Sequence, residues 1–354
     1  MDKLTYILVY LWRYRQVGRR QKPVRSDTLS SILTAIGQGI SNLGQPDPRF
    51  PPGSVKQYPL LADFLTALSK EDDPSSRSYP VNCTILRQLP LVTPTADARF
   101  HYKNRHLQHL IVVAFYWLLR PAEYLNAPDA GSHSEAFTFR SIQFTIHDRV
   151  WNASDPACPL NDETDLLNIT FASLEFSDQK NSVRGEKVGH KPNNDPFLCP
   201  AKALGRIALH LRIFNAPIDA PIYRHFNPDR NQWFDIKSSD VTAALRACAR
   251  AVSNATGIDP QLISARSLRP GGATALLCAG IDKDAIQLLG RWKSDAMLRY
   301  LRIQAAVLAN NYAQQMLDHG SYTFHPSVYA EGGLPVQAPP EVAAILAHDE
   351  LYQD

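Results

Sequence analysis

The stretch SARSLRPGGATALLCAG, residues 264–280, decides how the second half of this chain folds. Two arginines three residues apart, Arg266 and Arg269, run directly into Pro270 and two glycines. Proline is favoured in the first turn of a helix, and the backbone N–H groups of that turn attract an anion. Glycines beside it permit close approach of DNA or of a neighbouring helix. The stretch therefore predicts a helix that begins with a phosphate clamp formed by Arg269.

Most of the remaining chain has apolar residues at helical spacing, and residues 136–192 are the exception. That region holds three short β-rich runs joined by polar loops, which are AFTFRSIQFTI, LLNITFASLEF and EKVGH. The pattern predicts a mainly α protein with a small three-stranded antiparallel sheet, an α+β class.

The order of these segments predicts three parts. Residues 1–92 form a helical N-terminal domain, which RQLPLVTP (87–94) links to a second domain at 93–324. That domain opens with one long, buried helix over 99–125, which Pro121 breaks. A Pro- and Gly-rich linker with a short C-terminal helix occupies 325–354.

The net charge of +3 is only mildly basic, but the positive residues are unevenly distributed. Six of them are interleaved with aromatic residues near the N-terminus: Arg13, Arg15, Arg19, Arg20, Lys22 and Arg25. This cluster indicates a DNA-contacting patch, with a targeting signal or a solvated helix face as alternatives.

Several classes of site are absent from the sequence. The five cysteines form no C-x-x-C pair, and no phosphate-binding glycine loop or dinucleotide fingerprint occurs. The apolar run over 4–12 is too short to span a bilayer. We therefore expect an intracellular protein with no cofactor, no metal, no small-molecule substrate and no membrane partner.

Polar residues at predicted helix junctions form the candidate site: Arg120, Glu123, Lys180, Arg266, Arg269, Trp292 and Tyr300. Guanidiniums that converge on one phosphate neutralise its oxygens and stabilise the transition state of phosphoryl transfer. A tyrosine beside such cations is a better nucleophile, because they favour its phenolate. A lysine on a sheet turn can protonate the leaving 5′ oxygen. This chemistry cleaves and rejoins DNA without metal or ATP.

In their order along the chain, these residues resemble the tyrosine recombinases, the Cre and phage-integrase group. The resemblance covers roughly 100–315 and is closest to the recombinase domains of eukaryotic DIRS-type and Crypton mobile elements. Arg120 and Glu123 reproduce the spacing of the family's first arginine and its acidic partner. RSLR (266–269) is similar to its H-x-x-R box, LLGRW (288–292) to its L-G-H/W box, and RYLR (299–302) to its nucleophile segment.

The resemblance implies the catalytic fold of DNA breaking-rejoining enzymes, preceded by a helical core-binding domain. It implies a site-specific recombinase that acts through a covalent 3′-phosphotyrosine, as a homo-tetramer on two duplex DNA sites, in the nucleus. The alternative is a domesticated or decayed element protein that binds DNA without catalysis. A type IB topoisomerase and a helical scaffold protein are weaker interpretations.

Two departures from the family pattern concern single positions. Arg266 stands where most of the family has histidine, and an arginine cannot act as a general base. Tyr300 follows Trp292 by eight residues, one fewer than in Cre-like enzymes. Taken alone, Arg120 and Glu123 also fit an intrahelical ion pair, and Trp292 fits a core anchor.

Two site roles have a rival residue. Tyr312 is a second candidate nucleophile, but it falls within an apolar helical stripe formed by Met297, Leu301, Ala305, Leu308, Tyr312 and Met316. We therefore favour Tyr300, at the edge of that stripe. Lys187 competes with Lys180, which is preferred because it directly follows the predicted strand that ends in LEF.

Overall fold

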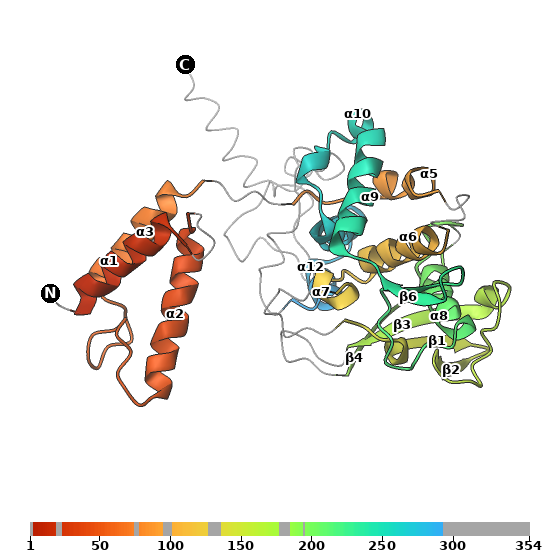
Figure 1. Cartoon of the computed structure of the whole chain (residues 1–354), viewed down its shortest axis with the longest axis horizontal. Coiled ribbons are helices and arrows are strands. Elements are labelled where there is room, and N and C mark those ends of the chain that lie inside the picture. Colours follow the sequence, from red (N-terminus) through yellow and green to blue (C-terminus); the bar gives the residue numbers. More distant parts are fainter. Residues whose placement is uncertain are drawn as a thin grey trace, which may run out of the picture. The chain divides into compact units, whose positions relative to one another are not determined.

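The computed structural model describes residues 3–18, 23–73, 78–94, 101–126, 136–176, 185–193 and 195–292. The chain divides into two compact units, Met1–Arg77 and Ser78–Asp354 (Figure 1). The expected mainly helical architecture with a small antiparallel sheet is confirmed. Within the described part of the chain, no helix has the length and apolar character needed to cross a membrane.

In its described residues, the first unit has three helices, α1 (Lys3–Gln16), α2 (Ser26–Asn42) and α3 (Pro59–Glu71). Their contacting faces form a small leucine core of Leu11, Leu29, Leu33, Leu61 and Leu68. Asp72 ties the ends of the helices together, because its carboxylate accepts hydrogen bonds from Ser26 and Arg15. Arg15 of the predicted DNA-contacting cluster is thus engaged within the unit.

The boundary between the units differs from the expected one. Residues 87–94 are not a linker, because α5 (Leu89–Val92) and the preceding α4 (Cys83–Leu86) pack against α9 (Ser238–Ala251) of the second unit. Ile85, Leu86 and Leu89 are fully buried there. The proline at the first turn of α5, which suggested a linker, instead begins a short helix.

The second unit is built around α6 (His101–Tyr116), which is buried from His106 to Phe115. This helix contacts α8 (Pro200–Ile213), α9 (Ser238–Ala251) and α11 (Leu268–Cys278). Shorter helices complete the unit: α7 (Pro121–Tyr124), α10 (Ser253–Thr256), α12 (Lys283–Gly290) and the 3₁₀ helices η1 (Phe139–Ser141), η2 (Asp165–Asn168), η3 (Pro260–Leu262) and η4 (Ala265–Ser267).

Within the part of the chain that the structure describes, the main sheet has four antiparallel strands where three were expected. Its order is β2-β1-β3-β4, formed by β1 (Ile142–Ile146), β2 (Arg149–Asn152), β3 (Ile169–Phe176) and β4 (Glu186–His190). The additional strand β2 returns through a two-residue turn in which His147 and Asp148 have φ of 50° and 58°. Such a turn usually carries Asn-Gly, so His-Asp at these positions does not indicate a hairpin.

A separate hairpin of β5 (Arg224–Asn227) and β6 (Gln232–Asp235) was also not predicted. Its strands have four residues each, too few for alternation to stand out. Helix α8 packs on β3, and α6 contacts β5, so the helices and both sheets share one core.

The long helix expected over 99–125 ends at Tyr116. Leu118 then adopts a left-handed conformation with φ of 52°, and the chain turns before Pro121 begins α7. Arg120 is extended with ψ of 150°, as expected of a residue that precedes proline. The turn at Leu118 brings α7 and the C-terminal end of α6 to one location, where the candidate site lies.

Helix α11 begins as residues 264–280 predicted, with Pro270 in its first turn. The two glycines permit close packing within the protein: a Cβ on Gly271 would overlap the backbone of Val81, and one on Gly272 the carbonyl oxygen of Phe115. The beginning of α11 is therefore pressed against the end of α6, which fixes the position of Arg269.

Candidate active site

Arg120 and Glu123 form the first pair of the site. The Nη1 of Arg120 donates to Oε1 of Glu123 at 2.8 Å, and the backbone N–H of Arg120 donates to Oε2 at 2.7 Å. The carboxylate is buried, with 2% exposure, whereas the Arg120 side chain is 23% exposed. The pair is thus more than a surface ion pair, because a buried carboxylate orients a guanidinium that still reaches solvent.

Arg269 lies in the first turn of α11 and is buried, with 3% exposure. Its Nη1 donates to the carbonyl oxygen of Leu118 at 2.7 Å, and its Nη2 donates to that of Gly290. These two acceptors belong to the turn after α6 and to the end of α12. The second arginine is therefore held in a defined plane by segments that are distant in the sequence.

Trp292 covers Arg269, with the guanidinium carbon 4.2 Å from the centre of the indole ring. Close packing against Gly290 makes this possible, since a Cβ there would overlap the ring. The contact joins Trp292 to a predicted phosphate-binding arginine. It also places the last described residue of the chain beside Arg269, eight positions before Tyr300.

Arg291 is a site residue that the sequence analysis missed. Its side chain is 1% exposed and lies 3.3 Å from Oε2 of Glu123, so that one carboxylate contacts two arginines. Burial lowers the pKa of Arg291 to about 10, although nearby Glu123 opposes the shift. Its neighbours in LLGRW match the family box, but nothing in the sequence indicates that this side chain turns inward.

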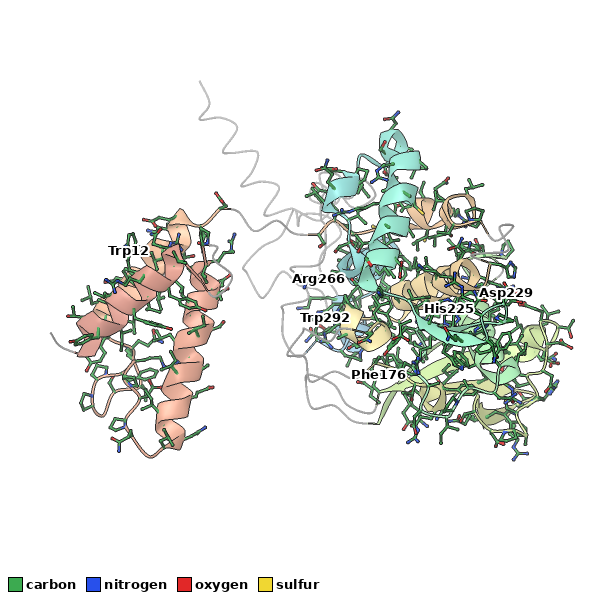
Figure 2. All side chains as sticks on the ribbon, in the orientation of Figure 1. Trp12, Phe176, His225, Asp229, Arg266 and Trp292 are labelled. Carbon is green, nitrogen blue, oxygen red and sulfur yellow. The ribbon has the colours of Figure 1, made fainter. Side chains whose placement is uncertain are left out.

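Arg266 is exposed on η4, directly before α11. Two hydrogen bonds hold its 3₁₀ turn: the Tyr124 hydroxyl donates to the carbonyl of Ala265, and the N–H of Ala265 donates to the Thr242 hydroxyl. Burial raises the pKa of the Tyr124 phenol, so this site tyrosine is a poor nucleophile. Figure 2 labels Arg266 and Trp292 in the part of the view where α7 and α12 lie.

The described residues on either side of the segment that contains Lys180 are Phe176 and Gly185. The ring centre of Phe176, which Figure 2 labels, lies 3.9 Å from the guanidinium carbon of Arg291. The N–H of Gly185 donates to the carbonyl of Phe176 at 2.8 Å. The rival Lys187 lies on β4, half exposed, with Nζ 3.6 Å from Glu175.

Other predicted site residues lie outside the described residues, namely Lys180, Tyr300, the rival Tyr312, and Arg19, Arg20 and Lys22 of the N-terminal cluster. Arg13 and Arg25 are exposed in the first unit, and Arg15 pairs with Asp72 at 2.9 Å. The segment 325–354 also lies outside the described residues.

A second polar cluster lies on α6, α8 and β5, away from these arginines. The rings of His106 and His210 have centroids 5.1 Å apart, and His225 is 6.4 Å from His106. Burial lowers the pKa of His106 and of His225 to about 4. In the ranges that the structure describes, no group of histidine, cysteine and acidic residues is arranged to hold a metal ion.

The site therefore combines Arg120, Arg269 and Arg291 with the buried carboxylate of Glu123, and Arg266 is exposed on the turn that precedes Arg269. Its residues come from four separate segments of the chain, at 117–124, 176, 265–269 and 289–292. This excess of positive charge, partly buried and held by carbonyls, is suited to binding a phosphodiester and stabilising negative charge on it.

Neither a family model nor a curated protein sequence matches the chain. Among solved structures, it is similar to the Tn1549 transposon integrase in complex with transposon right end DNA, with a TM-score of 0.46, 10% identity, and coverage of 89% of this chain and 85% of that chain. It is also similar to a lambda integrase dimer bound to a COC′ core site, with a TM-score of 0.37, 12% identity, and coverage of 86% and 91%. For the XerA recombinase the TM-score is 0.34 and the identity 14%, with coverage of 88% and 98%. At these scores the similarities carry no argument about function, which depends on the site residues.

Proposed function

We propose that this chain is a site-specific DNA recombinase of the tyrosine recombinase type, which cleaves and rejoins strands through a covalent 3′-phosphotyrosine. One observation carries the proposal: Arg120 and Arg269, predicted as the two phosphate-binding arginines, are both fixed around the turn at Leu118. Arg120 follows that turn directly and is oriented by Glu123, and Arg269 donates to the Leu118 carbonyl.

In the proposed reaction the phenol oxygen of Tyr300 attacks the scissile phosphorus. A bond forms between that oxygen and phosphorus, and the bond from phosphorus to the 5′ oxygen breaks. The proton of Tyr300 passes to water, Lys180 gives one to the departing 5′ oxygen, and the products are a 3′-phosphotyrosine and a 5′ hydroxyl. Attack by another 5′ hydroxyl reverses these steps and joins a new strand.

The cations of the site have two tasks in this scheme. Arg120 and Arg269 neutralise the non-bridging oxygens, whose charge grows in the transition state. Together with Arg266 they also favour the phenolate of Tyr300, because opposite charges nearby lower the pKa of a phenol. Arg266 is always protonated, so it serves as a fixed charge and the proton of Tyr300 must leave by another route.

Duplex DNA is the proposed partner, and the surface beside Arg266 is suited to it. An open hollow of about 510 Å³ on α9 is lined by small hydroxyl side chains and by Arg246 and Arg250. Arg246 donates to the carbonyls of Ile263 and Gln261, which lie in the segment directly before η4. Hydroxyls and arginines of this kind are the usual donors to phosphate oxygens.

The resemblance extends the proposal to a eukaryotic mobile element as the source, a homo-tetramer on two DNA sites and residence in the nucleus. The alternative function is a DNA-binding protein that has lost turnover. The observation that favours it is Arg266, which occupies the position of the family's proton-handling histidine.

The test is an assay for a covalent complex. A binding duplex is first selected from a random pool, and is then nicked so that cleavage releases a short fragment and cannot be reversed. The protein, Tyr300→Phe and Tyr312→Phe are incubated with it in EDTA, and protein-linked DNA is detected on a denaturing gel. We expect an adduct with the parent protein and Tyr312→Phe, and none with Tyr300→Phe.

The other outcomes are equally specific. Loss of the adduct with Tyr312→Phe alone would move the nucleophile to that position. Tight binding to the selected duplex without an adduct would overturn the recombinase proposal in favour of the DNA-binding alternative. Absence of salt-dependent DNA binding would overturn both.

A further inference from the structure

Arg291 lies in an unusual place for a guanidinium. It is the residue after α12 and adopts a left-handed conformation, with φ of 56° and ψ of 44°, which directs its side chain into the unit. The side chain is almost fully buried against Phe176. Removing a charge from water is costly unless it is paired and hydrogen-bonded. The buried guanidinium of Arg291 therefore needs hydrogen-bond acceptors from the residues around it.

Its two terminal nitrogens contact four acceptors. Nη1 donates to the carbonyls of Trp117 at 3.1 Å and Leu289 at 3.0 Å. Nη2 donates to the carbonyl of Leu118 and to Oε2 of Glu123, each at 3.3 Å. These contacts join the end of α6, the beginning of α7 and the end of α12.

Two of the acceptors also hold the predicted phosphate-binding arginines. Glu123 accepts from both Arg120 and Arg291, and the Leu118 carbonyl accepts from both Arg269 and Arg291. Arg291 thus shares one acceptor with each of them. Without its guanidinium, Glu123 would lose one of its two cations, and the strained turn at Leu118 one of its donors.

We propose that Arg291 is a positioning residue that sets the geometry of both Arg120 and Arg269 for one phosphate. This inference rests on the proposed function, because it names the residue through which the two arginines act together. In this proposal Arg291 acts through the two acceptors that it shares with Arg120 and Arg269. A displacement of about 1 Å at a reacting centre can lower the rate about a hundredfold. If Arg120 and Arg269 are displaced in this way, the protein should still bind DNA but cleave it slowly.

The variants are Arg291→Met and Arg291→Lys, with Arg212→Met as a matched control. Arg212 also donates to four carbonyls, those of Ala153, Asp155, Pro156 and Cys158, but lies on α8 outside the site. Arg291→Met leaves Glu123 with one cation fewer and tests the full loss. Arg291→Lys keeps a charge near Glu123 and favours folding, but lacks the planar fork that spans two acceptors.

Two readouts separate positioning from stability. Thermal unfolding first defines a temperature at which each variant is folded. In a Tyr300→Phe background, dissociation constants are then measured for the selected duplex with a normal phosphate and with a neutral methylphosphonate at the scissile position. The rate of adduct formation at saturating DNA is measured with Tyr300 present.

We expect the parent protein and Arg212→Met to prefer the charged phosphate. Arg291→Met should lose most of that preference and form the adduct about a hundredfold more slowly, and Arg291→Lys should restore neither fully. Parent-like preference and rate in both folded Arg291 variants would overturn this inference alone. A parent protein with neither adduct nor phosphate preference would overturn the proposed function, and this inference with it.

Discussion

Replacement of Gly272 by alanine tests how tightly α11 is held against α6. A Cβ at this position would lie 3.4 Å from the carbonyl carbon of Phe115, within 3.0 Å of its oxygen, and against the side chain of Leu118. The oxygen belongs to the backbone of a buried helix, so it cannot move aside as a flexible side chain can. Helix α11 must shift instead, and Arg269 moves with it.

The expected magnitude is a balance of two effects. Overpacking a core costs about 1–3 kcal/mol, and a backbone contact of this kind belongs near the upper end. Alanine is favoured over glycine within a helix by about 1 kcal/mol. The net loss should be about 2 kcal/mol for the second unit, which lowers its melting temperature by about 5 °C.

The matched control is Gly39→Ala in α2, where an added Cβ would meet nothing within 4 Å. That change should stabilise the first unit by roughly 0.5–1 kcal/mol, because only helix propensity acts. Both variants are followed by calorimetry, and Gly272→Ala also by adduct formation, which should slow as Arg269 shifts. A higher melting temperature for Gly272→Ala would refute the packing argument and leave propensity as the sole effect.

Two further predictions concern acid. The pKa of His106 is lowered to about 4 by burial and is 6.5 when unfolded, so the unfolded chain binds the extra proton first and stability falls between pH 6.5 and about 4. His106→Gln retains a donor for the carbonyl of Ile222. It should reduce the loss of unfolding free energy between pH 7.5 and 5.5 by about 1.4 kcal/mol, measured by urea titration at both pH values. A loss equal to that of the parent protein would contradict this prediction. In the first unit, the hydrogen bond from Ser26 holds the pKa of Asp72 below its usual value of 3.8, so this stabilisation is present above pH 3.8 and is lost as the pH falls through the lower value of the folded state. Asp72→Asn should destabilise this unit by about 2 kcal/mol at neutral pH, measured by urea unfolding, and a stability equal to that of the parent would show that the carboxylate contacts contribute nothing.

Local signals in the sequence identified much of the secondary structure. Asp282 is of a residue type that favours the start of a helix, and its carboxylate accepts the N–H of Asp284 at the first turn of α12. The buried alternation of Ile142, Phe144 and Ile146 made β1 recognisable. Such features depend on neighbours along the chain, so a single sequence contains them.

Errors occurred where the backbone adopts a conformation that its residue types do not announce. Leu118, His147 and Asp148 all have positive φ without being glycine. Leu118 lies in the turn that follows the early end of α6, and His147 and Asp148 form the turn between β1 and β2. The boundary between the units was misplaced for a different reason. The local sequence of residues 87–94 resembles a linker, and only the tertiary structure shows that Leu89 is buried in the core of the second unit.

By itself, the sequence determined the helical and strand periodicities and the beginning of α11, and it suggested most of the candidate site residues. These follow from residue type and spacing. Only the tertiary structure decided that Arg291 turns inward and that Glu123 contacts two arginines, because both depend on the meeting of α7, α12 and the turn at Leu118. The physical reason is that a buried charge is stable only where distant segments supply its partners, and no local pattern records which segments will meet.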